Sequence, residues 1–236
     1  MNRVILLTAC VNPQGMIFTK LQNPGERLKQ YQETLIWYLE NTNYPIVFCE
    51  NTNTDISLEY KQYIKQNRLE YICFDGNNYD KERGKGYGEA LIIEYALSHS
   101  NLLKQADQII KITGRIIVKN VNQLVFGAFR SNKVYANRYK NASGLLCDSR
   151  FFISSPYFLL QFFLPNKVEL NDSKGYYFEH LLYNQIREYL KKGGGYSEFY
   201  LPLKFVGISG TSGTTLNQKT YLKAFIRFVL NKFQYK

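Results

Sequence analysis

The sequence has few of the residues that build metal sites and disulfide frameworks. Its 236 residues include two histidines, four cysteines and no Asp-x-Asp motif. The cysteines stand alone, without a Cys-x-x-Cys pair, and three of them lie in apolar runs or at the end of one. Isolated cysteines of this kind are typical of small buried side chains in a reducing compartment. We therefore expect neither a disulfide framework nor a zinc site.

Long apolar runs are also lacking. No stretch approaches the roughly 20 apolar residues that a membrane-spanning helix needs. The run Val4–Ala9 is too short for the hydrophobic part of a signal peptide and is typical of a strand. These features predict a cytoplasmic protein.

Acidic residues become scarce in the second half of the chain. Residues 1–118 contain 13 basic and 13 acidic side chains, whereas residues 119–236 contain 17 basic and 6 acidic ones. The whole net charge of +11 therefore lies in the second half. Such an excess indicates an anionic partner, which could be nucleic acid, a phosphorylated substrate or a membrane surface.

Short apolar runs alternate with helical patterns in the first half. The runs predict strands at Val4–Ala9, Ile46–Cys49, Leu69–Phe74 and Ile109–Ile112, with helices between them at Glu26–Glu40, Ser57–Gln66 and Glu82–Ser98. The less regular second half predicts strands at Val134–Tyr139, Phe151–Ser154 and Leu201–Val206, and helices at Pro156–Leu164 and from Asp172 or Ser173 to Lys192. This alternation predicts an α/β fold with a mostly parallel central sheet flanked by helices.

Polar side chains follow each strand predicted in the first half. In open α/β sheets, ligands bind beyond the carboxyl ends of the strands. The four ends carry Thr8 and Asn12, Glu50 and Asn51, Asp75, and Thr113, Gly114 and Arg115. Strand ends are often polar because they are turns, but four polar ends at one sheet edge favour a binding site.

A glycine-rich stretch, Lys81–Glu89, opens the third predicted helix. Glycines let backbone amides approach a ligand, and a helix N-terminus favours phosphate. Lys81, Arg83 and Lys85 add positive charge, so this stretch is a candidate for contact with an anionic ligand. The G-x-G-x-G spacing is neither a Walker loop nor a Rossmann fingerprint, so a helix start with small residues for close packing is the alternative.

Four segments, in this order, resemble a group of bacterial glycosyltransferases that assemble capsule and O-antigen polysaccharides and have a GT-A-like fold. The segments are Ile46–Asn53, Phe74–Tyr79, Gly84–Leu91 and Ile110–Arg115, with a weaker echo at Val206–Gly213. The resemblance implies that a nucleotide-sugar donor, expected to carry UDP, binds at the strand ends. It also implies that Asn12 and Glu50 face the base and ribose, and that Asp75 contacts the nucleoside. The turn from Lys85 to Glu89, which includes Gly86 and Gly88, would lie against the donor.

The chain departs from that family at its fourth strand. GT-A enzymes commonly hold a divalent metal there through Asp-x-Asp, whereas this segment reads Lys111-Ile112-Thr113-Gly114-Arg115. The negative charge that grows on the leaving diphosphate needs stabilisation, and lysine and arginine can supply it. We therefore hypothesise transfer without a metal or other cofactor, with Arg115 at the diphosphate, assisted by Lys111 or Lys85.

Transfer with inversion needs a carboxylate that deprotonates the acceptor hydroxyl. Asp148 precedes the strand at Phe151–Ser154, and Glu179 lies beside aromatic residues near the start of the long helix. We treat the two as equal candidates for the catalytic base, although each could instead pair with a nearby lysine or arginine. Asp172 is expected to cap the helix.

Residues 219–236 predict a basic amphipathic helix. Apolar side chains recur at helical spacing, and Lys219, Lys223 and Arg227 recur every four residues. Such a helix is typical of one lying on an anionic membrane, although its apolar face could equally pack on the domain. With no repeat or linker, residues 1–218 predict one domain, divided into a nucleotide-sugar-binding half at 1–118 and an acceptor half at 119–218.

We therefore expect a glycosyltransferase that acts on a lipid-linked saccharide or a growing surface glycan, at the inner face of the cell membrane. Two alternatives stay open at this point. A nucleotidyltransferase acting on sugar phosphates would normally need paired carboxylates for a metal. A nucleic-acid-binding protein would fit the charge, but the sequence shows no recognised motif, so we expect no nucleic-acid partner.

Overall fold

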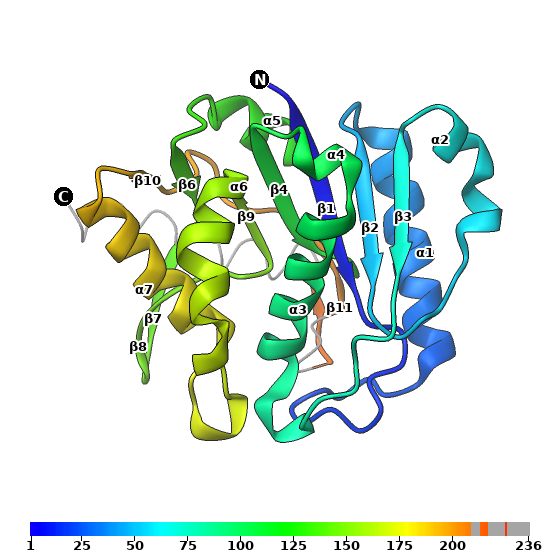
Figure 1. Ribbon diagram of the computed structural model, residues 1–236, viewed down its shortest axis with the longest axis horizontal. Coiled ribbons are helices and arrows are strands. Elements are labelled where there is room, and N and C mark those ends of the chain that lie inside the picture. The colour runs from blue at the N-terminus through cyan, green and yellow to red at the C-terminus, as the bar shows by residue number, and fades with distance from the viewer. Residues whose placement is uncertain (209–212, 217–224, 226–236) are drawn as a thin grey trace.

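The computed structural model describes residues 1–208, 213–216 and 225. Seven strands form the central sheet in the order β10-β6-β9-β4-β1-β2-β3 (Figure 1). They are β1 (Arg3–Ala9), β2 (Ile46–Glu50), β3 (Leu69–Cys73), β4 (Gln108–Thr113), β6 (Lys133–Tyr135), β9 (Phe151–Ser154) and β10 (Gly195–Ser197). β1 to β4 run parallel, and β9 is antiparallel to both of its neighbours. The prediction of an α/β fold with a mostly parallel central sheet is confirmed.

Helices cover both faces of this sheet (Figure 1). They are α1 (Pro24–Asn41), α2 (Lys61–Lys65), α3 (Gly84–His99), α4 (Asn101–Lys104), α5 (Val121–Gly127), α6 (Pro156–Phe158) and α7 (Phe178–Lys191). Successive side chains of β1 point to opposite faces of the sheet. Val4 and Leu6 belong to the core cluster that includes α3 and α7, whereas Ile5 and Leu7 belong to the cluster that includes α1 and α5. Central strands buried on both faces read as continuous apolar runs, which is why the sequence predicts them well.

Two of the predicted helices are less regular than expected. The segment predicted at Ser57–Gln66 is a 3-10 turn η1 (Ser57–Tyr60) followed by α2. After α6, the chain continues as a π-helix η3 (Leu159–Phe163) and a 3-10 helix η4 (Leu164–Glu169). A short 3-10 turn η2 (Lys81–Arg83) also precedes α3.

The start of α7 differs from the prediction. Asp172–Lys174 form a 3-10 turn η5, and Gly175 then adopts a left-handed φ of 76°, which ends that turn. α7 begins at Phe178, so the expected start at Asp172 or Ser173 is wrong, and Asp172 does not cap this helix. Its side chain is instead available to another element, described below.

Two smaller sheets complete the described part of the chain. β11 (Phe205–Ile208) lies between β5 (Ile116–Val118) and β12 (Thr215–Leu216), and β7 (Arg138–Asn141) forms a hairpin with β8 (Gly144–Cys147). The strand expected at Leu201–Val206 therefore begins later, at Phe205. The basic helix predicted at 219–236 and the loop residues 209–212 lie outside the described residues. Among the described helices, none has the length and apolar character needed to cross a bilayer.

Candidate functional site

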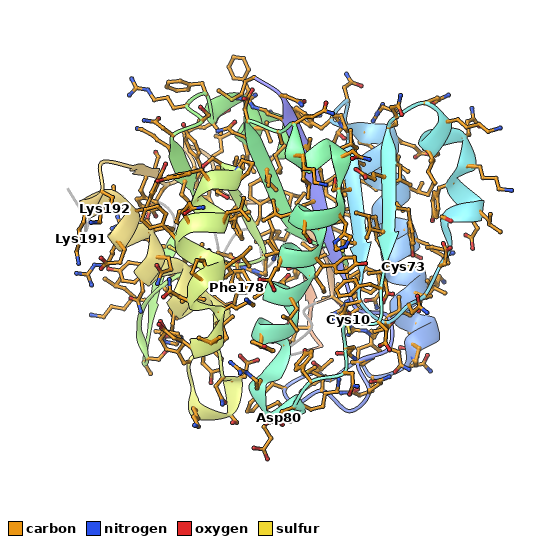
Figure 2. The ribbon with its side chains drawn as sticks, in the orientation of Figure 1. Cys10, Cys73, Asp80, Phe178, Lys191 and Lys192 are labelled. Atoms are coloured by element: carbon orange, nitrogen blue, oxygen red, sulfur yellow. The ribbon has the colours of Figure 1, made fainter. Side chains whose placement is uncertain are left out.

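A cavity of about 200 Å³ lies at the carboxyl ends of β1 and β4, where parallel α/β sheets bind their ligands. These ends point to the lower edge of the sheet in Figure 1, and Figure 2 shows Cys10 there. Nine of the predicted site residues line the cavity, namely Thr8, Asn51, Lys85, Gly86, Gly88, Glu89, Thr113, Arg115 and Glu179. The other six, Asn12, Glu50, Asp75, Lys111, Gly114 and Asp148, do not line it.

The carboxylate of Glu89 lines the part of the cavity that we call its floor, which is formed by Glu89, Thr8 and Thr113. Its Oε1 atom lies 2.6 Å from the Lys111 ammonium. The same oxygen accepts hydrogen bonds from the hydroxyls of Thr8 at 2.7 Å and Thr113 at 3.2 Å. The donors come from β1 and β4 and the acceptor from α3, so three packed elements fix this carboxylate in place.

Lys111 lies below this floor and is fully buried. Besides Glu89, its ammonium donates to the Ser149 carbonyl at 2.7 Å and the Thr113 hydroxyl at 3.3 Å. The nitrogen also lies 5.3 Å from the centre of the Phe178 ring, which Figure 2 shows between α7 and α3. An ammonium has three N–H donors, and all three are used. Lys111 is therefore not placed to contact a diphosphate, contrary to the role considered from the sequence.

Two guanidinium groups form the end of the cavity next to α1. Arg115 is 6% exposed and donates to Gln30 Oε1 at 2.9 Å, while Arg27 is 4% exposed and donates to the Cys10 carbonyl at 2.8 Å. Each guanidinium carbon lies 5.9 Å from the centre of the Tyr31 ring between them. Within the described residues, neither arginine forms an ion pair.

Two buried polar atoms of the cavity residues lack partners among the described residues. They are Arg115 Nε, a donor, and Asn51 Oδ1, an acceptor on a side chain that is 1% exposed. Burial also lowers the pKa of Arg115, although an arginine stays charged at neutral pH. A buried polar atom without a partner costs about 1–3 kcal/mol, so this end of the cavity is suited to an anionic ligand with additional polar groups.

The glycines of the glycine-rich stretch serve close packing. A Cβ atom at Gly84 would overlap the carboxyl group of Asp172, and one at Gly88 would overlap the Tyr79 hydroxyl. At Gly86 a Cβ would lie 3.2 Å from Asp172 Oδ1 and 3.2 Å from the Phe178 nitrogen. The close-packing alternative raised from the sequence thus describes what these glycines contact, although Gly86 and Gly88 also line the cavity.

Asp172 occupies the amino-terminal end of α3, where the sequence suggests a phosphate. Its Oδ2 accepts from the Gly86 amide at 3.5 Å, and the residue is 3% exposed. Burial raises the pKa of this carboxyl to about 6, the Gly86 amide and the Lys85 charge oppose the rise, and the Glu179 charge adds to it. The sequence predicted a helix cap for Asp172 and missed its place beside α3, because its partner lies 86 positions away.

Glu50 is fully buried and its carboxylate joins two loops. Oε1 accepts from the Val11 amide at 2.9 Å, and Oε2 accepts from the Thr52 and Thr54 amides, both at 2.9 Å. A carboxylate occupied in this way positions the loops after β1 and β2. The role at the base or ribose that the resemblance implied for Glu50 therefore does not match its place.

Three further predicted residues lie beside the cavity without lining it. Asn12 and Asp75 are exposed, and the Asn12 carbonyl accepts from Asn77 Nδ2 at 2.9 Å. Gly114 packs closely against β1. Its amide donates to the Thr8 carbonyl at 2.9 Å, and a Cβ at this position would lie 2.7 Å from the same oxygen. A nucleoside contact by Asn12 or Asp75 stays a prediction.

The two candidate bases differ in their surroundings. Asp148 forms a two-point ion pair with Arg150, with Nε to Oδ1 at 2.8 Å and Nη2 to Oδ2 at 2.5 Å. Glu179 lines the cavity, and its Oε1 accepts from the Ser149 hydroxyl at 2.5 Å. Asp148 thus pairs with a nearby arginine, which was the alternative to a role as the base. Glu179 is the candidate that lines the cavity.

The described residues offer no preformed cage for a divalent metal. A metal held by protein groups alone takes several carboxylate, histidine or thiolate ligands, whereas one held partly by a substrate's phosphates needs one or two carboxylates. No group of three or more such side chains gathers anywhere in the described ranges. At the place of the missing Asp-x-Asp, the Lys111 ammonium already pairs with the nearest carboxylate, Glu89, at 2.6 Å.

Comparisons with known proteins give weak likenesses only. No family model and no curated protein matches the sequence. The chain is similar to a solved structure described as a nucleotide-diphospho-sugar transferase from Desulfovibrio desulfuricans, with 10% identity and a TM-score of 0.44 over 84% of this chain and 80% of that one. The mannosyltransferase Ktr4p from S. cerevisiae has 12% identity and a TM-score of 0.41, over 74% and 62%.

A third solved structure, the WbbM bifunctional glycosyltransferase, is 15% identical with a TM-score of 0.43. The match covers 96% of this chain but 44% of that protein, so the chain spans less than half its length. With TM-scores below 0.5 and identities this low, none of these likenesses establishes a shared family or activity. The cavity itself therefore has to support any function assigned to the chain.

Proposed function

We propose that this chain is a glycosyltransferase that moves a sugar from a nucleotide-sugar donor, with UDP as the nucleotide, to a saccharide acceptor. The observation that carries the proposal is the mixed charge of the cavity lining. Arg27 and Arg115 both approach the Tyr31 ring and form no ion pair within the described residues, and we call this group the arginine end. Asp172 and Glu179 lie close enough to interact with each other and with Lys85, and they line the cavity with Glu89 and Arg150, a group that we call the carboxylate end. A ligand with an anionic part and a hydroxyl-rich part fits this mixed lining.

The arginine end would hold the diphosphate. Negative charge grows on the diphosphate as its bond to the sugar breaks, and a fixed guanidinium stabilises that charge. Arg115 lines the cavity and forms no ion pair within the described residues, so its charge is available to such a ligand. Transfer without a divalent metal is supported by the lack of Asp-x-Asp, at whose place Lys111 pairs with Glu89.

The carboxylate end would hold the sugar and the acceptor hydroxyl. In an inverting transfer, Glu179 takes the hydroxyl proton while the acceptor oxygen bonds to the anomeric carbon. The bond from that carbon to the diphosphate breaks, and its electron pair leaves with the diphosphate. Tyr177 and Phe178 line the cavity beside Glu179, and aromatic faces of this kind pack well on sugar rings.

A thermal-shift panel tests the donor class. The panel contains UDP, GDP and dTDP and their glucose or mannose conjugates, each with and without Mn²⁺. We expect a nucleotide sugar to raise Tm by several degrees, UDP-linked donors to give the largest shift, and EDTA to leave the shift unchanged. A salt-sensitive shift with DNA or RNA and none with any nucleotide would contradict the proposal, and dependence of the shift on Mn²⁺ would refute its metal-independent part.

We further propose that the acceptor is a lipid-linked or growing capsule or O-antigen glycan and that residues 219–236 hold the protein on an anionic membrane. The support is the basic sequence pattern alone, and each basic residue near such a surface contributes about 1 kcal/mol. A full-length chain with Lys219, Lys223 and Arg227 changed to glutamine should float with anionic liposomes far less than the unaltered protein. The matched control changes three exposed lysines of the neutral half, Lys29, Lys61 and Lys65. Equal flotation of both variants would exclude the membrane role.

A further inference from the structure

The two oxygens of the Glu89 carboxylate have different surroundings. Oε1 takes the three donors of the cavity floor, from Lys111, Thr8 and Thr113. Oε2 receives no donor from the described residues, and it is not among the buried polar atoms that lack a partner. The side chain is 19% exposed and lines the cavity. Oε2 is therefore an acceptor that is open to whatever occupies the cavity.

This open acceptor is held on rigid elements. Thr8 and Thr113 face each other as neighbours in the β1–β4 register, and Lys111 lies two residues before Thr113 on the same strand. The Lys111 ammonium is itself fixed by the Ser149 carbonyl at 2.7 Å. A carboxylate with one saturated oxygen is held in a single rotamer, so the direction of Oε2 is defined before any ligand arrives.

The negative charge of the Glu89 carboxylate and the lack of a proton on Oε2 determine which ligand groups this atom can contact. A carboxylate oxygen repels a phosphate and accepts from a hydroxyl or an N–H group. Glu89 lines the cavity together with the carboxylates Asp172 and Glu179, the cations Lys85 and Arg150, and the aromatic residues Tyr177 and Phe178. Of the two parts of a nucleotide sugar, the sugar ring carries the hydroxyls that suit such a position.

We propose that Glu89 Oε2 accepts a hydrogen bond from a hydroxyl of the donor's sugar, and that Thr8, Thr113 and Lys111 position it for this contact. Glu89 then determines which sugars bind, because a donor without a hydroxyl at that position leaves Oε2 unpaired. The inference rests on the proposed function and adds to it which group of the protein recognises the sugar.

The test compares a nucleotide with its own sugar conjugate. Dissociation constants are measured by calorimetry for UDP and UDP-glucose, GDP and GDP-mannose, and dTDP and dTDP-glucose, on the wild type and on Glu89→Gln. With Oε1 of the new amide facing Lys111, its NH₂ group would face the cavity, which turns an acceptor into a donor. We expect the nucleotide Kd to change less than about twofold and the nucleotide-sugar Kd to rise about 10-fold or more.

Two more variants separate recognition from structure. Thr8→Val keeps the shape of the side chain and removes one donor to Oε1, so it should weaken only the sugar conjugate, by a few-fold. Glu94→Gln is the matched control on α3, because Glu94 pairs with Lys167 and lies outside the cavity lining. It should bind both ligands as the wild type does.

The outcomes distinguish the two proposals. An unchanged nucleotide-sugar Kd in Glu89→Gln overturns the role of Glu89 while the proposed function stands. Equal weakening of nucleotide and nucleotide sugar also overturns it, because a merely structural role would act on both. If the wild type binds none of the six ligands, the proposed function fails, and the role of Glu89 fails with it.

Discussion

An Arg115→Met protein is expected to lose about 100-fold in kcat/KM for sugar transfer while its Tm stays level or rises. The loss follows because the guanidinium is the proposed partner of the leaving diphosphate, and its Nε has no other acceptor among the described residues. The Tm holds because Arg115 is 6% exposed without a carboxylate partner, which makes its charge costly to bury. Steady-state kinetics and thermal unfolding of the same preparations measure both effects.

Two variants support the interpretation of Arg115. Arg115→Lys keeps the charge but loses the planar fork, so it should recover activity only in part. Arg83→Met is the matched control, since Arg83 also stacks on a tyrosine, 3.8 Å from the Tyr87 ring centre, and donates to a carbonyl, that of Leu170 at 3.1 Å, yet lies outside the cavity lining. It should keep wild-type kcat/KM. Wild-type activity in Arg115→Met, or equal losses in both methionine variants, would contradict the diphosphate role.

The sheet could be predicted from the sequence because burial on both faces leaves a simple signal. Strands in the middle of a parallel sheet read as short apolar runs, and β1, β2 and β4 do so. Their carboxyl ends necessarily meet at one edge, so the sequence alone predicts that Thr8, Asn51 and Thr113 lie together. This part of the cavity follows from topology alone.

The partners of charged side chains could not be predicted in the same way. Lys111 interrupts the apolar run of β4, and a lone lysine gives no sign of its partner, yet it is fully buried because Glu89, from α3, lies 2.6 Å away. Glu50 stands at a strand end like a ligand contact, but four neighbouring donors occupy it. Which acid meets which base depends on tertiary packing, and no local spacing records it.

The glycine-rich stretch predicts an anion at the N-terminus of α3, and the structure has one there. The anion is the carboxyl group of Asp172 rather than a phosphate of a ligand. A helix N-terminus stabilises any negative group, whether it belongs to a ligand or to the chain. The glycine pattern indicates free amides at the start of a helix, but it does not indicate that Asp172 contacts them. That contact depends on how the turn η5, which contains Asp172, packs in the folded state.

Replacing Asp172 by asparagine is expected to remove a pH dependence of stability. Burial raises the pKa of this carboxyl from 3.8 to about 6 in the folded state. The folded protein therefore binds the proton more tightly than the unfolded chain does, and stability from this group is greatest below pH 3.8 and is lost as pH rises through 6. A difference of roughly two units corresponds to about 3 kcal/mol.

The measurement is the free energy of unfolding in urea at several pH values between 4 and 7.5. The value for Asp172→Asn minus that for the wild type should rise by about 2.5 kcal/mol over this range. Lys85 and Glu179 face the same carboxyl, and Tyr79 lies close to it, so Asp75→Asn, at an exposed site outside the cavity, is the control for general charge effects. A difference that stays flat with pH would show that Asp172 is ionised without cost. In that case Asp172 would be an ordinary charged group at the start of α3. Gly84 and Gly86 would then pack against a carboxylate that stays ionised over the whole range.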